Sequence, residues 1–226
     1  MFQDRAEAGQ RLARRLVSYK TKDPAVIALP RGGVPVGYEV AKILEAPLDI
    51  LMVRKLGFPG QADFAIGAIA DGDKWEILLN KEMVGDDMDL PPNYLEQEIA
   101  TKLDEMRKMK EIFRSHRPTI NITGRTIIAV DDGIATGATM RVMIKRLRRD
   151  KPGKIIVATP VASQEAVDLL KKEAEEVVCL DIPENFMAVG GFYVDFCPVT
   201  NDEVIQFLDR AHEHQRARPS ESILGK

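Results

Sequence analysis

The sequence has few of the residues that form cross-links or metal sites. Its 226 residues include 2 cysteines, Cys179 and Cys197, and 3 histidines, and none has a partner at metal-ligand spacing. A disulfide framework is therefore not indicated, and a reducing compartment is expected. No apolar run approaches the ~20 residues that a membrane helix needs. Residues 2–16 mix both charges and predict no signal peptide, so we expect a soluble, cytoplasmic protein.

The sequence also lacks a strong excess of one charge. Lysine and arginine number 32 and aspartate and glutamate 35, for a net charge of -3, and both signs are spread along the chain. This balance argues against a basic nucleic-acid-binding surface. The hydrophobic fraction of 45% is enough for a full core. The length suits one domain with an elaboration, or two small lobes.

Short apolar strands alternate with amphipathic helices along most of the chain. Strands are expected at 25–29, 48–53, 126–130, 155–160 and 176–182, and helices at 4–19, 35–44, 140–149, 164–173 and from 201 onward. The alternation predicts an α/β fold, a Rossmann-like parallel sheet with helices on both faces. Ligands in such folds bind beyond the carboxyl ends of the strands.

The middle of the chain departs from this alternation. Residues 57–63, GFPGQAD, have the composition of a mobile loop, and the segments on either side of residues 71–73 predict a hairpin. A long charged helix is expected at 93–115. We therefore divide the chain into a core, a helical insertion and a C-terminal part. The core consists of residues 1–80 and 119–200. Residues 81–118 are the helical insertion, which we expect to form a hood over the core. Residues 201–226 are the C-terminal helix and a loose tail.

The most informative segment is IIAVDDGIATGAT, residues 127–139. A buried strand ends in Asp131 and Asp132, and a turn of small residues then begins a helix. Free backbone N–H groups from Ala135 to Thr139 would bind a phosphate at the positive end of that helix. The turn residues between them are Thr136, Gly137 and Ala138. The two acids can accept hydrogen bonds from ribose hydroxyls or hold a hydrated Mg²⁺, so the segment predicts a sugar-phosphate site.

A second loop and a basic pair are expected at the same edge of the sheet. Arg31, Gly32 and Gly33 follow the first strand, and paired glycines leave backbone amides open beside a fixed cation. Arg54 and Lys55 are expected to close the second strand. The three cations could together neutralise a pyrophosphate.

These segments resemble type I phosphoribosyltransferases over most of the chain. Residues 127–139 are similar to the family's thirteen-residue motif for phosphoribosyl pyrophosphate (PRPP), and 29–37 to its pyrophosphate loop, where the family often has a cis peptide near the position of Arg31. The resemblance implies Mg²⁺-dependent transfer of phosphoribose from PRPP to a nitrogen acceptor, with release of pyrophosphate. Four residues are assigned catalytic roles: Asp131, Asp132, Arg54 and Lys55, the acids also holding Mg²⁺ mostly through water and PRPP.

The acceptor is left open, although a purine or pyrimidine base is favoured. Oxopurine-type members carry an Asp at the position of Ala135, whereas adenine- and uracil-type members carry Ala there. No clear general base is found, and Asp63 is a weak candidate. Phe186 is the first choice for stacking on a base and Tyr193 the second, since aromatic faces bind nucleobases.

Three other interpretations are weaker. The strand before Asp131 could belong to a Walker B motif, but the GxxxxGK[ST] motif of a P-loop does not occur in the chain. The GxGxxG motif of a dinucleotide-binding site does not occur either. A PRPP synthetase would need an ATP-binding region, which is not found. A PRPP- or nucleotide-sensing regulator with the same fold is the principal alternative. The sequence leaves a homodimer open.

Overall fold

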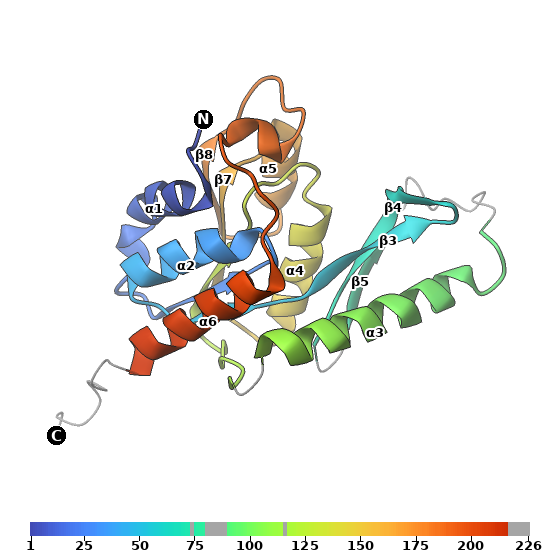
Figure 1. Cartoon of the computed structure of the whole chain (residues 1–226), viewed down its shortest axis with the longest axis horizontal. Coiled ribbons are helices and arrows are strands. Elements are labelled where there is room, and N and C mark those ends of the chain that lie inside the picture. The colour runs from blue at the N-terminus through green and yellow to red at the C-terminus, as the bar shows by residue number, and fades with distance from the viewer. Residues whose placement is uncertain (73–74, 80–89, 115–116, 217–226) are drawn as a thin grey trace.

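A computed structural model describes residues 1–72, 75–79, 90–114 and 117–216, without the side chains of 61–64 (Figure 1). Its centre is a five-stranded sheet in the order β2-β1-β6-β7-β8, and every neighbouring pair is parallel. The strands are β1 Pro24–Ala28, β2 Leu48–Ile50, β6 Thr126–Val130, β7 Lys154–Val161 and β8 Glu176–Asp181. The parallel sheet confirms the predicted α/β fold.

Helices cover both faces of this sheet. They are α1 Arg5–Arg15, α2 Gly33–Leu44, α4 Ala138–Arg149, α5 Gln164–Leu170 and α6 Asn201–Arg216, with short 3-10 helices η1 Val17–Tyr19 and η2 Val189–Phe192. Side chains alternate along the strands, so Val26 and Ile128 join one core with α1, α2 and α6. Ile27 and Ile127 join a second core with α4 and α5. The continuous apolar strands are thus explained by burial on both faces.

A separate antiparallel sheet and the long helix form a second part of the molecule. The sheet contains β3 Val53–Phe58, β4 Gln61–Ala70 and β5 Glu76–Leu79, and the helix is α3 Tyr94–Arg114. These strands extend away from the parallel sheet, and α3 runs beside them (Figure 1). Buried Leu56 shares a core with Met106 and Phe113 of α3, while Val53 shares one with α4. The small sheet therefore lies between two helices.

Three predictions about local structure are corrected. The segment 57–63 is the tip of the β3–β4 hairpin rather than a loop, with Phe58 paired to Gln61. The second predicted strand ends at Ile50, and a new strand begins at Val53, so Arg54 and Lys55 start a strand instead of closing one. The first helix ends at Arg15. The predicted hairpin around 71–73 and the long helix are confirmed.

Some predictions fall on residues outside the described part of the chain. These are the first nine residues of the predicted insertion, 81–89, and the tail at 217–226. Within the described part, no helix combines the length and apolar character needed to cross a membrane.

We expect Phe113→Ala to lower the free energy of unfolding by ~3–5 kcal/mol, because the ring is fully buried where α3 joins the core. Urea denaturation followed by circular dichroism measures this. Ile112→Ala is the matched control, since Ile112 is 45% exposed, and its effect should stay within about 0.5 kcal/mol. Equal losses in the two variants would contradict this packing.

Candidate active site

The site begins with the parallel pairing of β1 and β6. Ala28 lies opposite Val130 at the carboxyl ends of these strands, so the loops that follow them start side by side. The Leu29 amide donates to the Val130 carbonyl at 2.9 Å, which continues the pairing into the loops. The Pro30–Arg31 peptide bond is cis, as the family resemblance predicts.

Two glycines bring the first loop against the two acids. A Cβ atom on Gly32 would overlap the Asp132 carboxylate, and one on Gly33 would lie 2.9 Å from the Val130 carbonyl oxygen. Neither approach is open to a residue with a side chain. The absence of two Cβ atoms is therefore what lets the predicted pyrophosphate loop lie on the predicted ribose-binding acids.

The two acids share a buried environment but have different partners. The Asp131 carboxylate accepts a hydrogen bond from the Asp132 amide at 2.9 Å. Burial raises the pKa of Asp131 well above its usual range, and the neighbouring Asp132 adds to the rise. Burial also raises the pKa of Asp132, but Arg5 opposes this because its Nε lies 2.7 Å from Asp132 Oδ2. Two adjacent, partly buried carboxylates form a centre of negative charge that a cation would stabilise.

Sequence reasoning missed Arg5 and the structural role of Tyr193. We call residues 182–197, which follow β8, the hood loop. The Tyr193 hydroxyl donates to the Asp132 carbonyl at 2.6 Å, and its ring packs 5.4 Å from Phe2 and 5.0 Å from Phe196 between centroids. The N-terminus and the hood loop therefore meet at Asp132. No local sequence signal marks a contact between residues so far apart in the chain.

The predicted phosphate loop ends at the open N-terminus of α4. Gly137 is the N-cap at φ 77°, a conformation that favours glycine, and it has no side chain to cap the helix; the Thr136 hydroxyl accepts only a long bond, 3.5 Å, from the Ala138 amide. The first N–H groups of a helix have no intrahelical partner, so this end can accept an anion. Ala135 and Thr136 are exposed there. Ser163, the N-cap of α5, donates to the Ala135 carbonyl and holds the loop against the next strand.

The predicted cations are divided between surfaces. Arg31 is exposed and Arg54 half-buried, and burial lowers the pKa of Arg54, while the nearby Glu105 raises it and Arg31 lowers it by a smaller amount. The Arg54 guanidinium therefore lies within electrostatic reach of both Glu105 and Arg31. Lys55 is exposed and points to the opposite face of β3 from Arg54, since neighbouring side chains on a strand alternate. The predicted basic pair is thus not a pair in space.

The two aromatic side chains proposed to stack on the acceptor, Phe186 and Tyr193, differ in exposure. Phe186 is half-buried and stacks on Phe192 at 5.6 Å between centroids, which leaves its other face for a ligand or the protein. Tyr193 is only 6% exposed and its ring is packed, so stacking of Tyr193 on an acceptor does not fit the geometry. The side chain of Asp63, the weak candidate for a base, lies outside the described residues.

The donor atoms at this edge suit Mg²⁺. Asp131 and Asp132 offer hard carboxylate oxygens, and Mg²⁺ is usually bound by one or two carboxylates together with water and phosphate oxygens. Among the described residues, no three histidine, cysteine or carboxylate side chains converge as a ligand set. Mg²⁺ would therefore be held here through the two acids, water and the ligand's own oxygens.

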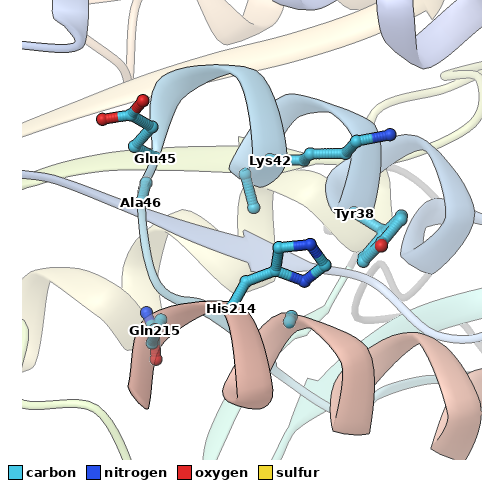
Figure 2. A pocket seen from close by; sticks show the side chains of 8 residues that line it. Tyr38, Lys42, Glu45, Ala46, His214 and Gln215 are labelled. Atoms are coloured by element: carbon cyan, nitrogen blue, oxygen red, sulfur yellow. The ribbon is translucent and has the colours of Figure 1, made fainter. Parts of the chain in front are cut away.

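A different pocket lies away from these loops. It has a volume of about 220 Å³ and lies between α2 and α6, where its lining includes Tyr38 and Lys42 of α2 and His214 of α6 (Figure 2). None of the predicted site residues lines it. The site predicted from sequence is the edge formed by the two loops.

We expect Gly32→Ala to destabilise the protein by ~1–3 kcal/mol, because the added methyl group must displace the Asp132 carboxylate that Arg5 holds. Thermal denaturation measures the effect. Gly191→Ala is the control, since a Cβ atom there meets no atom within 4 Å. A Gly32→Ala variant as stable as Gly191→Ala would show that the two loops are not in close contact.

The chain is similar in sequence and fold to several known proteins. The chain is 42% identical to the Thermus thermophilus protein TT1426, whose crystal structure superposes with a TM-score of 0.77 and covers 92% of this chain and 97% of that chain. A purine phosphoribosyltransferase from Pyrococcus horikoshii is too distant to bear on the acceptor, at 16% identity and a TM-score of 0.45 over 85% of this chain and 90% of that one.

The curated relatives include a Mycobacterium tuberculosis protein whose name provisionally calls it a phosphoribosyl transferase. This Mycobacterium tuberculosis protein is 44% identical over 213 residues, which are 94% of this chain and 47% of that protein. The chain thus spans about half the length of the curated relatives it matches. The family model of the phosphoribosyl transferase domain matches residues 2–196. The chain belongs to the phosphoribosyl transferase domain family.

Proposed function

We propose that this protein transfers the 5-phosphoribosyl group of Mg-PRPP to a nitrogen acceptor, a purine or pyrimidine base, and releases pyrophosphate. The observation that carries the proposal is the close approach of Gly32 to Asp132. It joins a loop suited to pyrophosphate to one suited to a ribose 5-phosphate. A molecule with phosphate at both ends of a ribose matches the two loops.

In this mechanism the protein orients PRPP rather than reacting with it. The amides and hydroxyls of residues 135–139 bind the 5′-phosphate at the N-terminus of α4. Asp131 and Asp132 accept hydrogen bonds from the ribose hydroxyls and hold C1 towards the acceptor. Mg²⁺, when bound through these acids and the ligand, supplies positive charge that stabilises the leaving pyrophosphate.

The protein's own cations help to neutralise the negative charge of the leaving pyrophosphate. Arg31 and Arg54 lie within electrostatic reach of each other, and Arg54 also of Glu105, so the two guanidinium groups could together offer positive charge to an anion. Lys55, on the opposite face of β3, acts as a separate charge at the same end of the hairpin. Preorganised charge of this kind favours the developing anion in the transition state.

The acceptor would reach C1 from the side of the hood loop. Val189 of this loop packs directly on Gly133, one residue beyond the acids, so the loop covers the sugar-binding turn. Phe186, half-buried in the same loop, is the aromatic residue proposed to stack on the base. A stacked ring excludes water from the reacting face.

A PRPP- or nucleotide-sensing regulator with the same fold is the second candidate. It is favoured by Ala135, which offers no group for proton transfer at the position where oxopurine-type enzymes carry an acid. A panel assay separates the two functions: PRPP and Mg²⁺ are incubated with each common nucleobase, and pyrophosphate release is measured. We expect release with at least one base. Binding of PRPP without release for any base would favour the regulator.

We expect a nucleoside 5′-monophosphate or Mg-PRPP to bind with micromolar affinity in calorimetry. Replacing the acids together, Asp131→Asn with Asp132→Asn, should weaken PRPP by about tenfold or more, because hydrogen bonds to charged groups contribute ~1.5–3 kcal/mol. Absence of heat and of competition at saturating Mg²⁺ would refute the site. Unchanged affinity in the double variant would place the sugar elsewhere.

We expect Arg54→Ala and Lys55→Ala, each alone, to weaken PRPP more than a nucleoside monophosphate, which has no pyrophosphate. Calorimetry with both ligands measures the ratio. The Arg54 variant should show the larger ratio, because Arg54 lies near Arg31 and is partly desolvated. Equal losses for the two ligands would remove these residues from the leaving-group site.

We expect Phe186→Ala to raise the acceptor KM about tenfold, given that base stacking contributes ~1–3 kcal/mol. Affinity for PRPP should change little, because the phosphate loop is separate. Thermal melting must accompany the kinetics, since Phe186 also stacks on Phe192. A large fall in melting temperature with an unchanged KM would mean that Phe186 is only a packing residue.

A further inference from the structure

Arg5 occupies a position that local helix preferences disfavour. It is the first residue of α1, where the helix dipole is positive and a cation is unfavourable. The start of the helix is otherwise well formed, because the N-cap Asp4 accepts from the Glu7 amide at 2.8 Å. A residue that breaks a local rule in a well-formed element is explained by a distant partner.

The distant partners of Arg5 are at the proposed site. Its Nε donates to Asp132 Oδ2 at 2.7 Å, and the two side chains are only 10% and 13% exposed. A second guanidinium nitrogen donates to the Cys197 carbonyl at 2.8 Å. The guanidinium plane lies over the Phe196 ring, 3.9 Å from its centroid. Three contacts in three directions fix both the place and the plane of the group.

The backbone around Arg5 is tied to the hood loop. The Phe2 amide donates to the Phe192 carbonyl at 2.8 Å, and the Val194 amide donates to the Phe2 carbonyl at 2.9 Å. The Asp195 amide donates to the Gln3 carbonyl at 2.8 Å. Arg5 is therefore held by a short pairing of the N-terminus with the loop that covers the sugar site.

Building on the proposed function, we infer that Arg5 is a positioning residue that holds the Asp132 carboxylate in the orientation needed to accept a hydrogen bond from the ribose 2′-hydroxyl. Arg5 contacts one carboxylate oxygen, while Gly32 approaches the same group from the first loop. A carboxylate has about four acceptor positions, so one bond from Arg5 leaves others for the sugar. Arg5 itself need not contact the ligand.

The inference predicts a specific loss, that of discrimination between ribose and deoxyribose. AMP, GMP, CMP and UMP are titrated calorimetrically, each beside its 2′-deoxy counterpart. The wild-type protein should prefer the tightest-binding ribonucleotide about tenfold, as expected for one hydroxyl bonded to a carboxylate. Arg5→Ala should bring the two affinities within about twofold, because an unheld carboxylate no longer favours the hydroxyl.

Arg11→Ala is the matched control. Arg11 lies on the same helix and its guanidinium stacks 4.7 Å from the Phe2 ring centroid, but it forms an ion pair with Glu7 rather than with Asp132. It should keep the wild-type preference. Arg5→Lys keeps the charge but loses the planar group, and it should show an intermediate preference for the ribonucleotide. If circular dichroism shows that Arg5→Ala is unfolded, Arg5→Lys takes its place in the test.

The outcomes separate the inference from the function on which it rests. If the wild-type protein binds none of the eight nucleotides, the proposed function fails. If it binds both forms of each nucleotide equally, the ribose contact fails, and the role of Arg5 with it. If a folded Arg5→Ala or Arg5→Lys protein keeps the full preference, or Arg11→Ala loses it equally, only the role of Arg5 is overturned.

Discussion

The parallel pairing of β1 with β6 determines where the site residues lie. Both strands end at the same edge, so a glycine loop and an acidic loop emerge next to each other. The glycines then permit a contact that side chains would prevent. If this pairing shifted by one residue, side chains now in one core would face the other, and the two loops would separate.

The cost of this arrangement is a concentration of negative charge. Asp131 and Asp132 lie partly buried at the edge of the parallel sheet, and this desolvation raises the pKa of both carboxyl groups. Arg5 offsets the charge at Asp132, and a magnesium-bound substrate would offset it at both. The Arg54 guanidinium is partly desolvated and lies within electrostatic reach of both Glu105 and Arg31. Perturbed pKa values that cluster in this way are typical of functional sites.

The sequence predicts local structure well where that structure depends on neighbours in the chain. Residues 127–139 combine a buried strand, two acids and a small-residue turn in one segment, and the structure forms each as expected. Arg5 was missed because its partner is 127 residues away and nothing near either residue marks the contact. Tyr193 was taken for a ligand-facing aromatic residue, since burial by Phe2 from the other end of the chain cannot be read locally. The hairpin tip at 57–63 was taken for a loop, because its glycines and proline are also typical of loops.

A single ligand should span the two loops, and a crystal structure of the protein with PRPP and Mg²⁺ would show whether it does. We expect the 5′-phosphate on the amides of residues 135–139 and the ribose hydroxyls within hydrogen-bond distance of Asp131 and Asp132. The pyrophosphate should lie against Arg31, Gly32 and Gly33. A ligand bound elsewhere, such as the pocket between α2 and α6, with the two loops still in direct contact and empty, would contradict the account.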